Sequence, residues 1–255
     1  MTDAVVCEDL WKSYHFRRPV GLKTLLVGAS MSRETRFART WALSGVSFRV
    51  ARGHAFGVVG YNGSGKSTLL SLLLGTVHSD RGKLEMRGRV APLLEVGAGF
   101  HGDLTGRENV FLYGSILGMT IKEIRDCYER IAEFSELEDA LENPVRTYSA
   151  GMIARLGFSI NIHSPAEILL IDEVLAVGDA RFQEKCRRFL RAFKARDGTL
   201  IVVSHNMVEL ASICDEGICL DMGHVIHAGS IQSVIEAYRR LVAAVEAGNH
   251  AQRAA

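Results

Sequence analysis

The stretch Gly60–Thr68 reads GYNGSGKST, and it decides the fold. It matches the pattern G-x-x-x-x-G-K-[ST], in which a glycine-rich loop joins a buried strand to a helix. The apolar run Ala55–Val59 precedes the loop and predicts the strand, and Leu69–Leu74 follows it and predicts the helix. Glycines let the loop amides turn inward, and the helix N-terminus adds positive potential. The stretch therefore predicts a cradle for a nucleoside triphosphate, in which Lys66 reaches the β- and γ-phosphates and the Ser67 hydroxyl faces Mg²⁺.

Length and composition limit the class of protein. The 255 residues suit one α/β domain or one domain with an inserted subdomain. A net charge of +1 predicts no overall attraction to nucleic acid or acidic membranes. The five cysteines form no C-x-x-C pair, which favours reduced thiols over a metal site. Since we find neither a signal peptide nor an apolar run long enough to span a bilayer, we expect a cytoplasmic chain whose membrane partner, if any, is separate.

Alternating strand-like and helix-like segments predict an α/β fold with a largely parallel sheet. We expect a core of about 1–91 and 165–230, a helical subdomain of about 92–164, and a C-terminal helix of about 231–247. The apolar stripe of that last helix, which includes Tyr238, predicts ordinary packing against the core.

Two capping boxes predict helix starts inside the inserted part. Thr105 is followed three residues later by Glu108, and Thr120 in the same way by Glu123. A third helix is expected over Met152–Ile162. These boxes stabilise helix ends, and we assign them no function.

Two strand ends carry polar side chains beyond the glycine loop. An apolar strand ends at Asp172 and Glu173, and the next strand ends at His205. In parallel α/β sheets ligands bind at the carboxyl ends of strands, so Asp172 is placed to hold Mg²⁺ and Glu173 to polarise a water. If the two strands are neighbours, His205 lies beside Glu173 and contacts the γ-phosphate or the attacking water.

The segment Tyr148–Met152 begins the third helix of the inserted part. Ser149 and Gly151 offer a hydroxyl and bare amides to an anion at a helix N-terminus. Taken alone, the same residues favour a plain N-cap over an anion site.

In their order and spacing these motifs resemble the nucleotide-binding subunit of an ABC transporter, and the resemblance covers nearly the whole chain. It implies an α/β fold with a P-loop (RecA-like) core, a mostly parallel sheet, an antiparallel edge sheet and an inserted α-helical subdomain. It also implies ATP and Mg²⁺ as cofactors, and ATP hydrolysis. The implied Walker A residues are Gly60, Asn62, Gly63, Ser64, Gly65, Lys66, Ser67 and Thr68. In Walker B, the resemblance implies Asp172 as the Mg²⁺ ligand and Glu173 as the catalytic base. It further implies Ser149 and Gly151 as the signature element, Asp179 as the D-loop residue and His205 as the catalytic switch histidine.

The adenine contact is implied at Tyr14, with Trp41 as the alternative. The segments Glu95–His101 and Ala176–Phe182 look like those of the ATPases that export polysaccharides such as O-antigen, capsule, teichoic acid or galactan. Relatives in that branch also carry an insert like Arg17–Thr40, which looks like a helix near the membrane subunit; the residues themselves are equally compatible with a surface loop. No C-terminal carbohydrate-binding domain is expected.

This chain departs from the family at two places. Ala150 and Met152 replace residues of the usual Leu-Ser-Gly-Gly-Gln signature. The glutamine that usually touches Mg²⁺ has no clear counterpart, although Glu95 stands near its place.

The resemblance implies a homodimer, because the phosphate loop and the signature element of one chain face different subunits. It implies a peripheral subunit on the cytoplasmic face of the membrane, bound to an integral permease in two copies that handles a lipid-linked glycan, with no nucleic acid. The main alternative is a soluble ABC-type ATPase acting on nucleic acid or ribosomes, which the near-zero charge disfavours. A small-molecule kinase shares the loop but leaves Ser149 and His205 unexplained.

Overall fold

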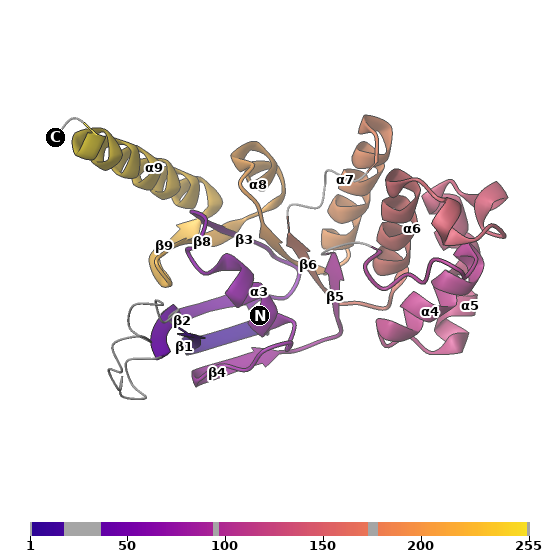
Figure 1. Cartoon of the computed structure of the whole chain (residues 1–255), viewed down its shortest axis with the longest axis horizontal. Helices are drawn as coiled ribbons and strands as arrows, with labels where there is room; N and C mark the ends of the chain where they lie inside the picture. Colours follow the sequence, from indigo (N-terminus) through magenta and orange to yellow (C-terminus); the bar gives the residue numbers. More distant parts are fainter. Residues whose placement is uncertain (1, 18–36, 94–96, 173–177, 254–255) are drawn as a thin grey trace, which may run out of the picture.

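The computed structural model describes residues 2–17, 37–93, 97–172 and 178–253. Two sheets form the α/β part, and a group of helices stands beyond one end of the larger sheet (Figure 1). Of the predicted insert Arg17–Thr40, residues 18–36 lie outside the described residues, as do Glu95 and the predicted base Glu173, while Arg17 ends one strand and residues 37–40 begin the next. Within the described ranges, no helix combines the length and the apolar character needed to cross a bilayer.

The smaller sheet is antiparallel and has the strand order β2-β1-β4. β2 is an edge strand whose stretch from Val46 to Val50 alternates buried and exposed side chains, which is the pattern of a half-exposed strand. Its buried face packs with α3 and with the larger sheet in one apolar cluster. The predicted antiparallel edge sheet is therefore confirmed, and it lies over the helix that follows the glycine loop. The bounds are β1 Asp3–Arg17, β2 Phe37–Ala51, β4 Arg81–Met86 and α3 Lys66–Leu73.

The larger sheet has six strands in the order β5-β6-β7-β3-β8-β9. All neighbours in it are parallel except β8 and β9. The strands that precede the glycine loop, the acidic pair and His205 are β3, β6 and β7, and all three are buried as their apolar sequences predict. The bounds are β3 Ala55–Gly60, β5 Val90–Leu93, β6 Ile168–Asp172, β7 Thr199–Val203, β8 Glu216–Asp221 and β9 His224–Ser230.

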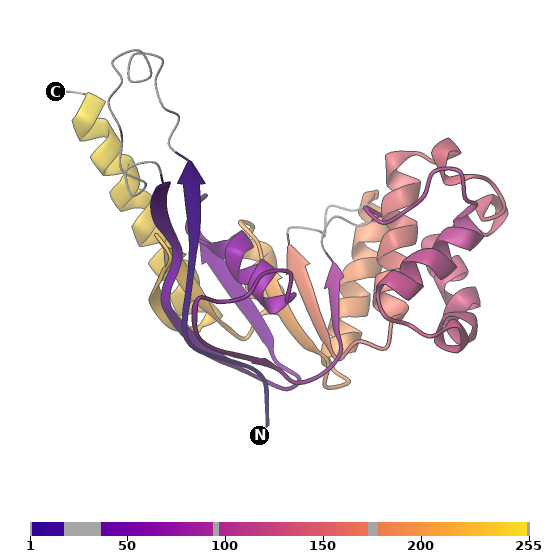
Figure 2. The ribbon, with the colours of Figure 1, turned by 60° about the horizontal axis from the view of Figure 1, so that its bottom comes forward.

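Helices cover both faces of the larger sheet. α3 is enclosed between the two sheets, as Figure 2 shows. The opposite face packs against α7 (Ala180–Lys194), α8 (Met207–Ile213) and α9 (Ile231–Arg253). The buried helix residues of this second layer are Phe182, Cys186, Leu190, Leu210, Ile213, Ile231, Val234 and Ile235.

The inserted helices are α4 (Gly106–Ile116), α5 (Ile121–Ser135) and α6 (Ala150–His163), and they share a separate apolar cluster. Both predicted capping boxes are confirmed, because the Thr105 and Thr120 side chains each accept a backbone N–H while the paired glutamate reaches back. α6 begins two residues earlier than predicted, since Ser149 rather than a later residue is its N-cap. Two short 3₁₀ turns, Glu138–Ala140 and Val145–Thr147, connect α5 to α6.

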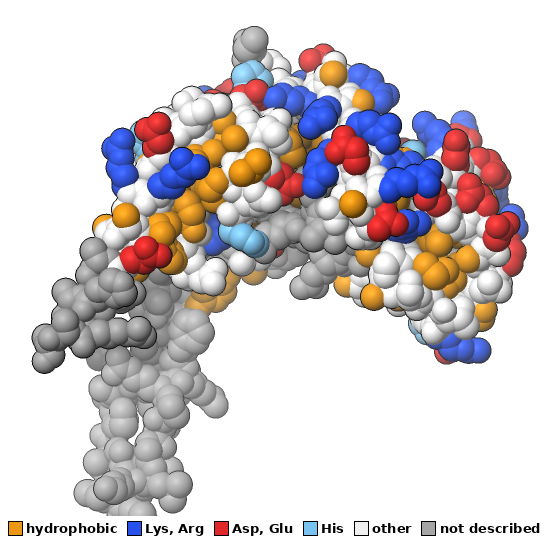
Figure 3. All heavy atoms as spheres, turned by 90° about the horizontal axis from the view of Figure 1, so that it is seen from above, with side chains coloured by type: hydrophobic (Ala, Val, Ile, Leu, Met, Phe, Trp, Pro, Cys, Tyr) orange, Lys and Arg blue, Asp and Glu red, His pale blue; other side chains and the backbone are white. Residues whose placement is uncertain are grey.

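The outer surface of α7 is basic but not a bare positive patch. Glu184 lies 3.4 Å from Arg187 and 3.9 Å from Arg191, and Lys194 lies 2.7 Å from Asp215. Figure 3 shows Asp and Glu side chains interspersed among Lys and Arg over this face of the molecule. The charge run of α7 therefore has the character of a solvated helix face.

Candidate active site

Contacts with neighbouring elements hold the glycine loop in its shape. Gly65 has a φ of +108°, in the region that side chains disfavour. A Cβ there would lie 2.6 Å from the carbonyl oxygen of Ala42 on β2. The backbone of Ser64 accepts a hydrogen bond from Gly223 at 3.0 Å, which ties the loop to the turn between β8 and β9. Neighbouring elements thus fix the second half of the loop from two sides.

Lys66 closes the loop from within. Its ammonium donates to the carbonyl oxygens of Gly60 at 2.7 Å and Tyr61 at 2.8 Å. These carbonyls stand at the start of the loop, so the positive charge is held across the mouth of the loop that the motif predicts for phosphate.

Three predicted groups come to one edge of the larger sheet. β7 lies between β3 and β6, and Asp172 pairs in register with Val203. His205 follows Val203 by two residues. The two strands are therefore neighbours, which is the condition under which His205 was expected beside the acidic strand end. Because parallel strands end at the same edge, Asp172 and His205 share that edge with the glycine loop.

Ser67 and Asp172 line one pocket of about 460 Å³, together with Pro92, Ala98 and Tyr113. A hydroxyl and a carboxylate are hard oxygen ligands of the kind that Mg²⁺ prefers, so this pair fits the ion. In the part of the chain that the structure describes, no cluster of three His, Cys, Asp or Glu side chains surrounds a metal position.

The signature residues stand apart from this pocket. Ser149 is exposed and caps α6, where its hydroxyl accepts the Met152 N–H at 3.2 Å. Around Gly151, a Cβ would meet only the Ser149 hydroxyl, at 3.8 Å, so the surface there is open. The described lining of the pocket at Ser67 includes neither residue. Within one chain, Ser149 and Gly151 therefore look like a plain N-cap with an open surface.

Tyr148 fixes the entrance to α6. Its ring is buried, and its hydroxyl donates to the Ala140 carbonyl at 2.7 Å. A Cβ on Gly106 would lie 2.2 Å from the Tyr148 hydroxyl oxygen, so the glycine at the start of α4 makes room for it. The tyrosine of the signature element is thus an anchor within the helical part.

Asp179 is the N-cap of α7, and it also joins two helices. Its carboxylate accepts the Phe182 N–H at 2.9 Å, and this bond is the main reason that the pKa of Asp179 is lowered. Arg155 of α6 lies 2.9 Å from the other carboxylate oxygen. Arg155 is not among the residues that the motifs predict. Its signal in the sequence is that no other Lys, Arg, Asp or Glu occurs in the helix Ala150–His163.

The two candidate adenine contacts differ in their surroundings. On Trp41, the Arg39 guanidinium stacks at 4.1 Å from a ring centroid and Trp11 meets it edge-on at 5.2 Å. The Tyr14 ring has the Lys12 ammonium 5.6 Å from its centroid. Trp41 is therefore engaged in packing within the small sheet, which agrees with Tyr14 as the preferred candidate.

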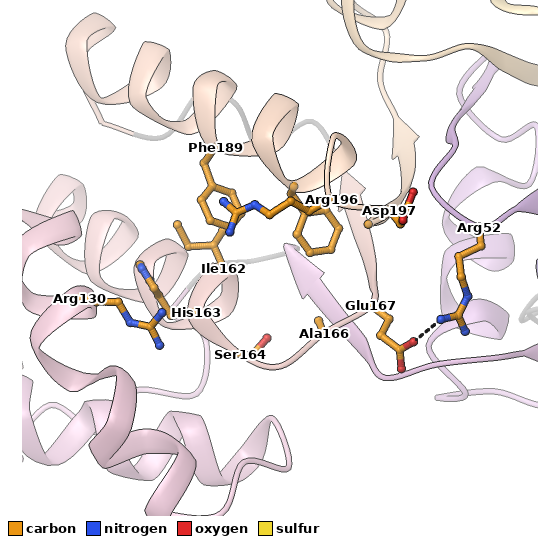
Figure 4. A pocket seen from close by; sticks show the side chains of 12 residues that line it. Arg52, Arg130, Ile162, His163, Ser164, Ala166, Glu167, Phe189, Arg196 and Asp197 are labelled. Carbon is orange, nitrogen blue, oxygen red and sulfur yellow. Dashed lines mark hydrogen bonds and ion pairs between the residues drawn. The ribbon is translucent and has the colours of Figure 1, made fainter.

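Another pocket, of about 660 Å³, lies at the opposite ends of β6 and β7 (Figure 4). Arg130, Arg196 and His163 line it together with the Glu167–Arg52 ion pair. It lies at the C-terminal ends of α6 and α7, where carbonyl groups carry negative potential and basic side chains are the usual complement. The described lining includes none of the residues that the motifs predict for phosphate, so the chemistry is assigned to the edge with the glycine loop.

Comparisons with known proteins agree with this geometry. A family model described as "ABC transporter" matches residues 43–176. The chain is 43% identical over 224 residues to an O-antigen export system ATP-binding protein of Klebsiella pneumoniae, covering 88% of this chain and 91% of that protein. It is 39% identical over 199 residues to a teichoic acids export ATP-binding protein of Bacillus cereus, covering 78% of this chain and 36% of that protein.

Solved structures show the same fold. A dimeric ATP-binding cassette bound to ADP and Pi matches with a TM-score of 0.69 at 20% identity, covering 89% of this chain and 98% of that one. An ATP-binding subunit of an ABC transporter matches with a TM-score of 0.72 at 19% identity, covering 90% of this chain and 91% of that one. The chain belongs to the ABC transporter family and is one of its ATP-binding, ATP-hydrolysing subunits.

Proposed function

We propose that this chain is the motor subunit of an exporter that moves a lipid-linked polysaccharide across the cytoplasmic membrane. The observation that carries the proposal is its 43% identity to an O-antigen export ATP-binding protein over 91% of that protein's length. The relatives named as teichoic acids export ATP-binding proteins support export as the activity. The chain would lie on the cytoplasmic face and act through a separate permease in two copies.

The residues divide the work of hydrolysis among them. Lys66 leaves the carbonyls of Gly60 and Tyr61 and binds the β- and γ-phosphates, while the amides of the glycine loop surround them. Ser67 and Asp172 hold Mg²⁺, which supplies charge neutralisation to the phosphates.

The attacking group is a water molecule at the γ-phosphorus. Glu173, which follows Asp172 directly, takes a proton from that water as the oxygen attacks, and ADP leaves with the bridging oxygen. His205 contacts the γ-phosphate from the neighbouring strand end. Tyr14 stacks on the adenine.

A complete site needs a second copy of the chain. Ser149 is exposed and Gly151 half-buried, and neither lines the described pocket at Ser67, so they complete no site within their own subunit. In a two-fold homodimer each signature helix N-terminus faces the γ-phosphate bound by the other subunit, with Asp179 near the interface. ATP then stabilises the closed dimer, and hydrolysis releases it.

The test uses two variants of the full chain purified with its permease. Glu173→Gln is expected to bind ATP, hydrolyse it poorly and accumulate as a dimer in ATP and Mg²⁺. Ser149→Arg is expected to abolish hydrolysis while nucleotide binding persists. The matched control is Thr120→Arg, since Thr120 is an N-cap of the same kind on α5. Hydrolysis by Ser149→Arg at the wild-type rate would disprove the composite site.

Cargo is tested separately from hydrolysis. Deletion of the gene is expected to leave lipid-linked glycan on the inner side of the membrane. Co-purification with ribosomes or DNA in place of an integral membrane protein would instead favour the alternative, a soluble ABC-type ATPase.

A further inference from the structure

The C-terminal helix touches the glycine loop. The ring of Tyr238 on α9 lies 6.1 Å from the ring of Tyr61, with the planes tilted by 50°. Tyr61 is the residue that follows Gly60, where β3 ends and the loop begins. The contact therefore joins the last helix of the chain to the first residue of the loop.

Tyr61 sets the shape of the first half of the loop. Its carbonyl oxygen accepts the Ser64 N–H at 3.1 Å and the Lys66 ammonium at 2.8 Å. The next two residues, Asn62 and Gly63, are exposed, and a Cβ on Gly63 would have no atom within 4 Å. This half of the loop is thus open to solvent, whereas the half at Gly65 is backed by β2.

α9 is a firm support for Tyr238. The helix begins where the Ile231 N–H donates to the Asp215 carbonyl at 3.0 Å. The Ile231 side chain fills the space over Gly57 of β3, where a Cβ would lie 2.7 Å from it. Val234 and Ile235 are buried in the core, so the first two turns cannot shift without disturbing it.

We propose that Tyr238 is a positioning residue for nucleotide binding: it holds Tyr61, and through Tyr61 the first half of the glycine loop, in the shape that receives phosphate. The inference rests on the proposed nucleotide site. A loop that is already ordered loses less conformational freedom when the ligand binds, so affinity rises without a new contact to the ligand. The effect belongs to binding rather than to the chemical step, because Tyr238 touches Tyr61 and not the strand ends that carry Asp172 and His205.

The expected result is a change in affinity for both nucleotides. Tyr238→Ala is expected to raise the Kd of ATP and of ADP by about two- to tenfold, the range for loss of one aromatic pair. The kcat at saturating ATP is expected to stay within about twofold of wild type, since only binding is affected. Tyr238→Phe keeps the ring and is expected to bind like wild type. Arg239→Gln, at an exposed position next to it, is the matched control.

A double-mutant cycle separates this role from general destabilisation. If Tyr238 acts through Tyr61, Tyr238→Ala changes the Kd in the wild-type background and not in the Tyr61→Ala background. A purely structural effect would lower the melting temperature and leave the Kd of the folded protein unchanged. If Tyr238→Ala does not fold, Tyr238→Leu preserves most of the apolar volume and answers the same question.

The outcomes distinguish this inference from the proposed function. ATP binding by the wild type and its loss in Lys66→Ala support the nucleotide site, whatever Tyr238 does. An equal Kd in wild type and Tyr238→Ala would overturn the role of Tyr238 and leave the proposed function standing. An equal loss of affinity in both backgrounds would also overturn it.

Discussion

Replacing Arg155 by alanine removes the bridge between the signature helix and α7. The guanidinium lies 2.9 Å from Asp179, 3.6 Å from Glu136 at the end of α5, and 5.1 Å from the centroid of the Phe182 ring. It therefore holds the helix that begins at Ser149 against the helix that begins at Asp179. We expect Arg155→Ala to weaken both the stability of the chain and the cooperation of these two helix starts.

The magnitude follows from how exposed each contact is. The Asp179 side chain is 62% exposed, so solvent screens the ion pair and its contribution to stability is small. The contact with the Phe182 ring contributes about 0.5–1 kcal/mol. Glu136 contributes little to the loss, because Lys185 remains 3.1 Å from it. The expected loss of about 0.5–1 kcal/mol therefore comes mainly from the ring contact and lowers the melting temperature by about 1–4 °C in a chain of this length.

The assay combines thermal unfolding with ATP hydrolysis. If the ion pair with Asp179 helps to hold the closed dimer, its loss lowers kcat by about two- to fivefold. A full factor of ten would require about 1.4 kcal/mol. The control is Arg107→Ala. Arg107 also makes an ion pair, 3.2 Å from Glu142, and its guanidinium lies 5.5 Å from the centroid of the Tyr128 ring. Both of these contacts lie within the inserted helical part, away from α7. Arg107→Ala is expected to lose stability and retain its kcat.

A double-mutant cycle with Asp179→Asn decides whether the bridge is real. Asparagine still accepts at an N-cap, so this variant removes the ion pair and keeps the cap. We expect the effects of the two substitutions on stability to be non-additive, because each removes the same ion pair. Additivity within about 0.3 kcal/mol, or a kcat of Arg155→Ala equal to that of Arg107→Ala, would refute the reasoning.

Two further predictions concern stability. The Asp80 carboxylate accepts a hydrogen bond from the Ser13 hydroxyl at 2.5 Å, and this bond is the main cause that lowers the pKa of Asp80 to about 2. The ionised carboxylate therefore stabilises the fold above its ordinary pKa of about 3.9, and this stabilisation is lost as the pH falls toward 2. Asp80→Asn should therefore lower the urea midpoint at pH 7, by an amount that shrinks below about pH 4, whereas the exposed Asp126→Asn should not; a difference independent of pH would contradict this. Tyr148→Phe removes one hydrogen bond to the Ala140 carbonyl, which still accepts the Asn143 N–H at 2.9 Å, and should cost about 0.5–1.5 kcal/mol in thermal unfolding. Tyr128→Phe, whose hydroxyl has no described hydrogen bond, should cost less.

Local patterns in the sequence were sufficient for much of the fold. The capping boxes at Thr105 and Thr120 form as predicted, because all their groups lie within four residues. That parallel strands end at one shared edge also follows from pattern, since strands that alternate with helices build a parallel sheet, whereas the adjacency of β6 and β7 was left open by the sequence and comes from the structure. The strand ends at Asp172 and His205 are predictable for that reason.

Contacts between distant helices were not predictable in the same way. Tyr238 stands on an apolar stripe that predicts core packing, and its neighbours Val234 and Ile235 are indeed buried. Periodicity gives the face of a helix but not its position along the sheet, so the meeting of Tyr238 with Tyr61 is absent from the pattern. Arg155 and Asp179 likewise belong to helices whose relative placement no local signal specifies.

The arrangement of the site also determines which contacts with ATP can favour closure of the dimer. In the half of the loop next to β2, Gly65 is already backed by Ala42 and Ser64 is bonded to Gly223, so phosphate binding changes this backbone little. A ligand shifts a conformational equilibrium only by its difference in affinity for the two states. Contacts made by Lys66 are the same in one chain or in two, so they set affinity without favouring closure. The difference must come from groups that reach the nucleotide only in a dimer, and the exposed Ser149 and the half-buried Gly151 are the described candidates. Variants of the loop should therefore change how tightly one chain holds ATP, whereas variants at the start of α6 should change whether two chains close around it.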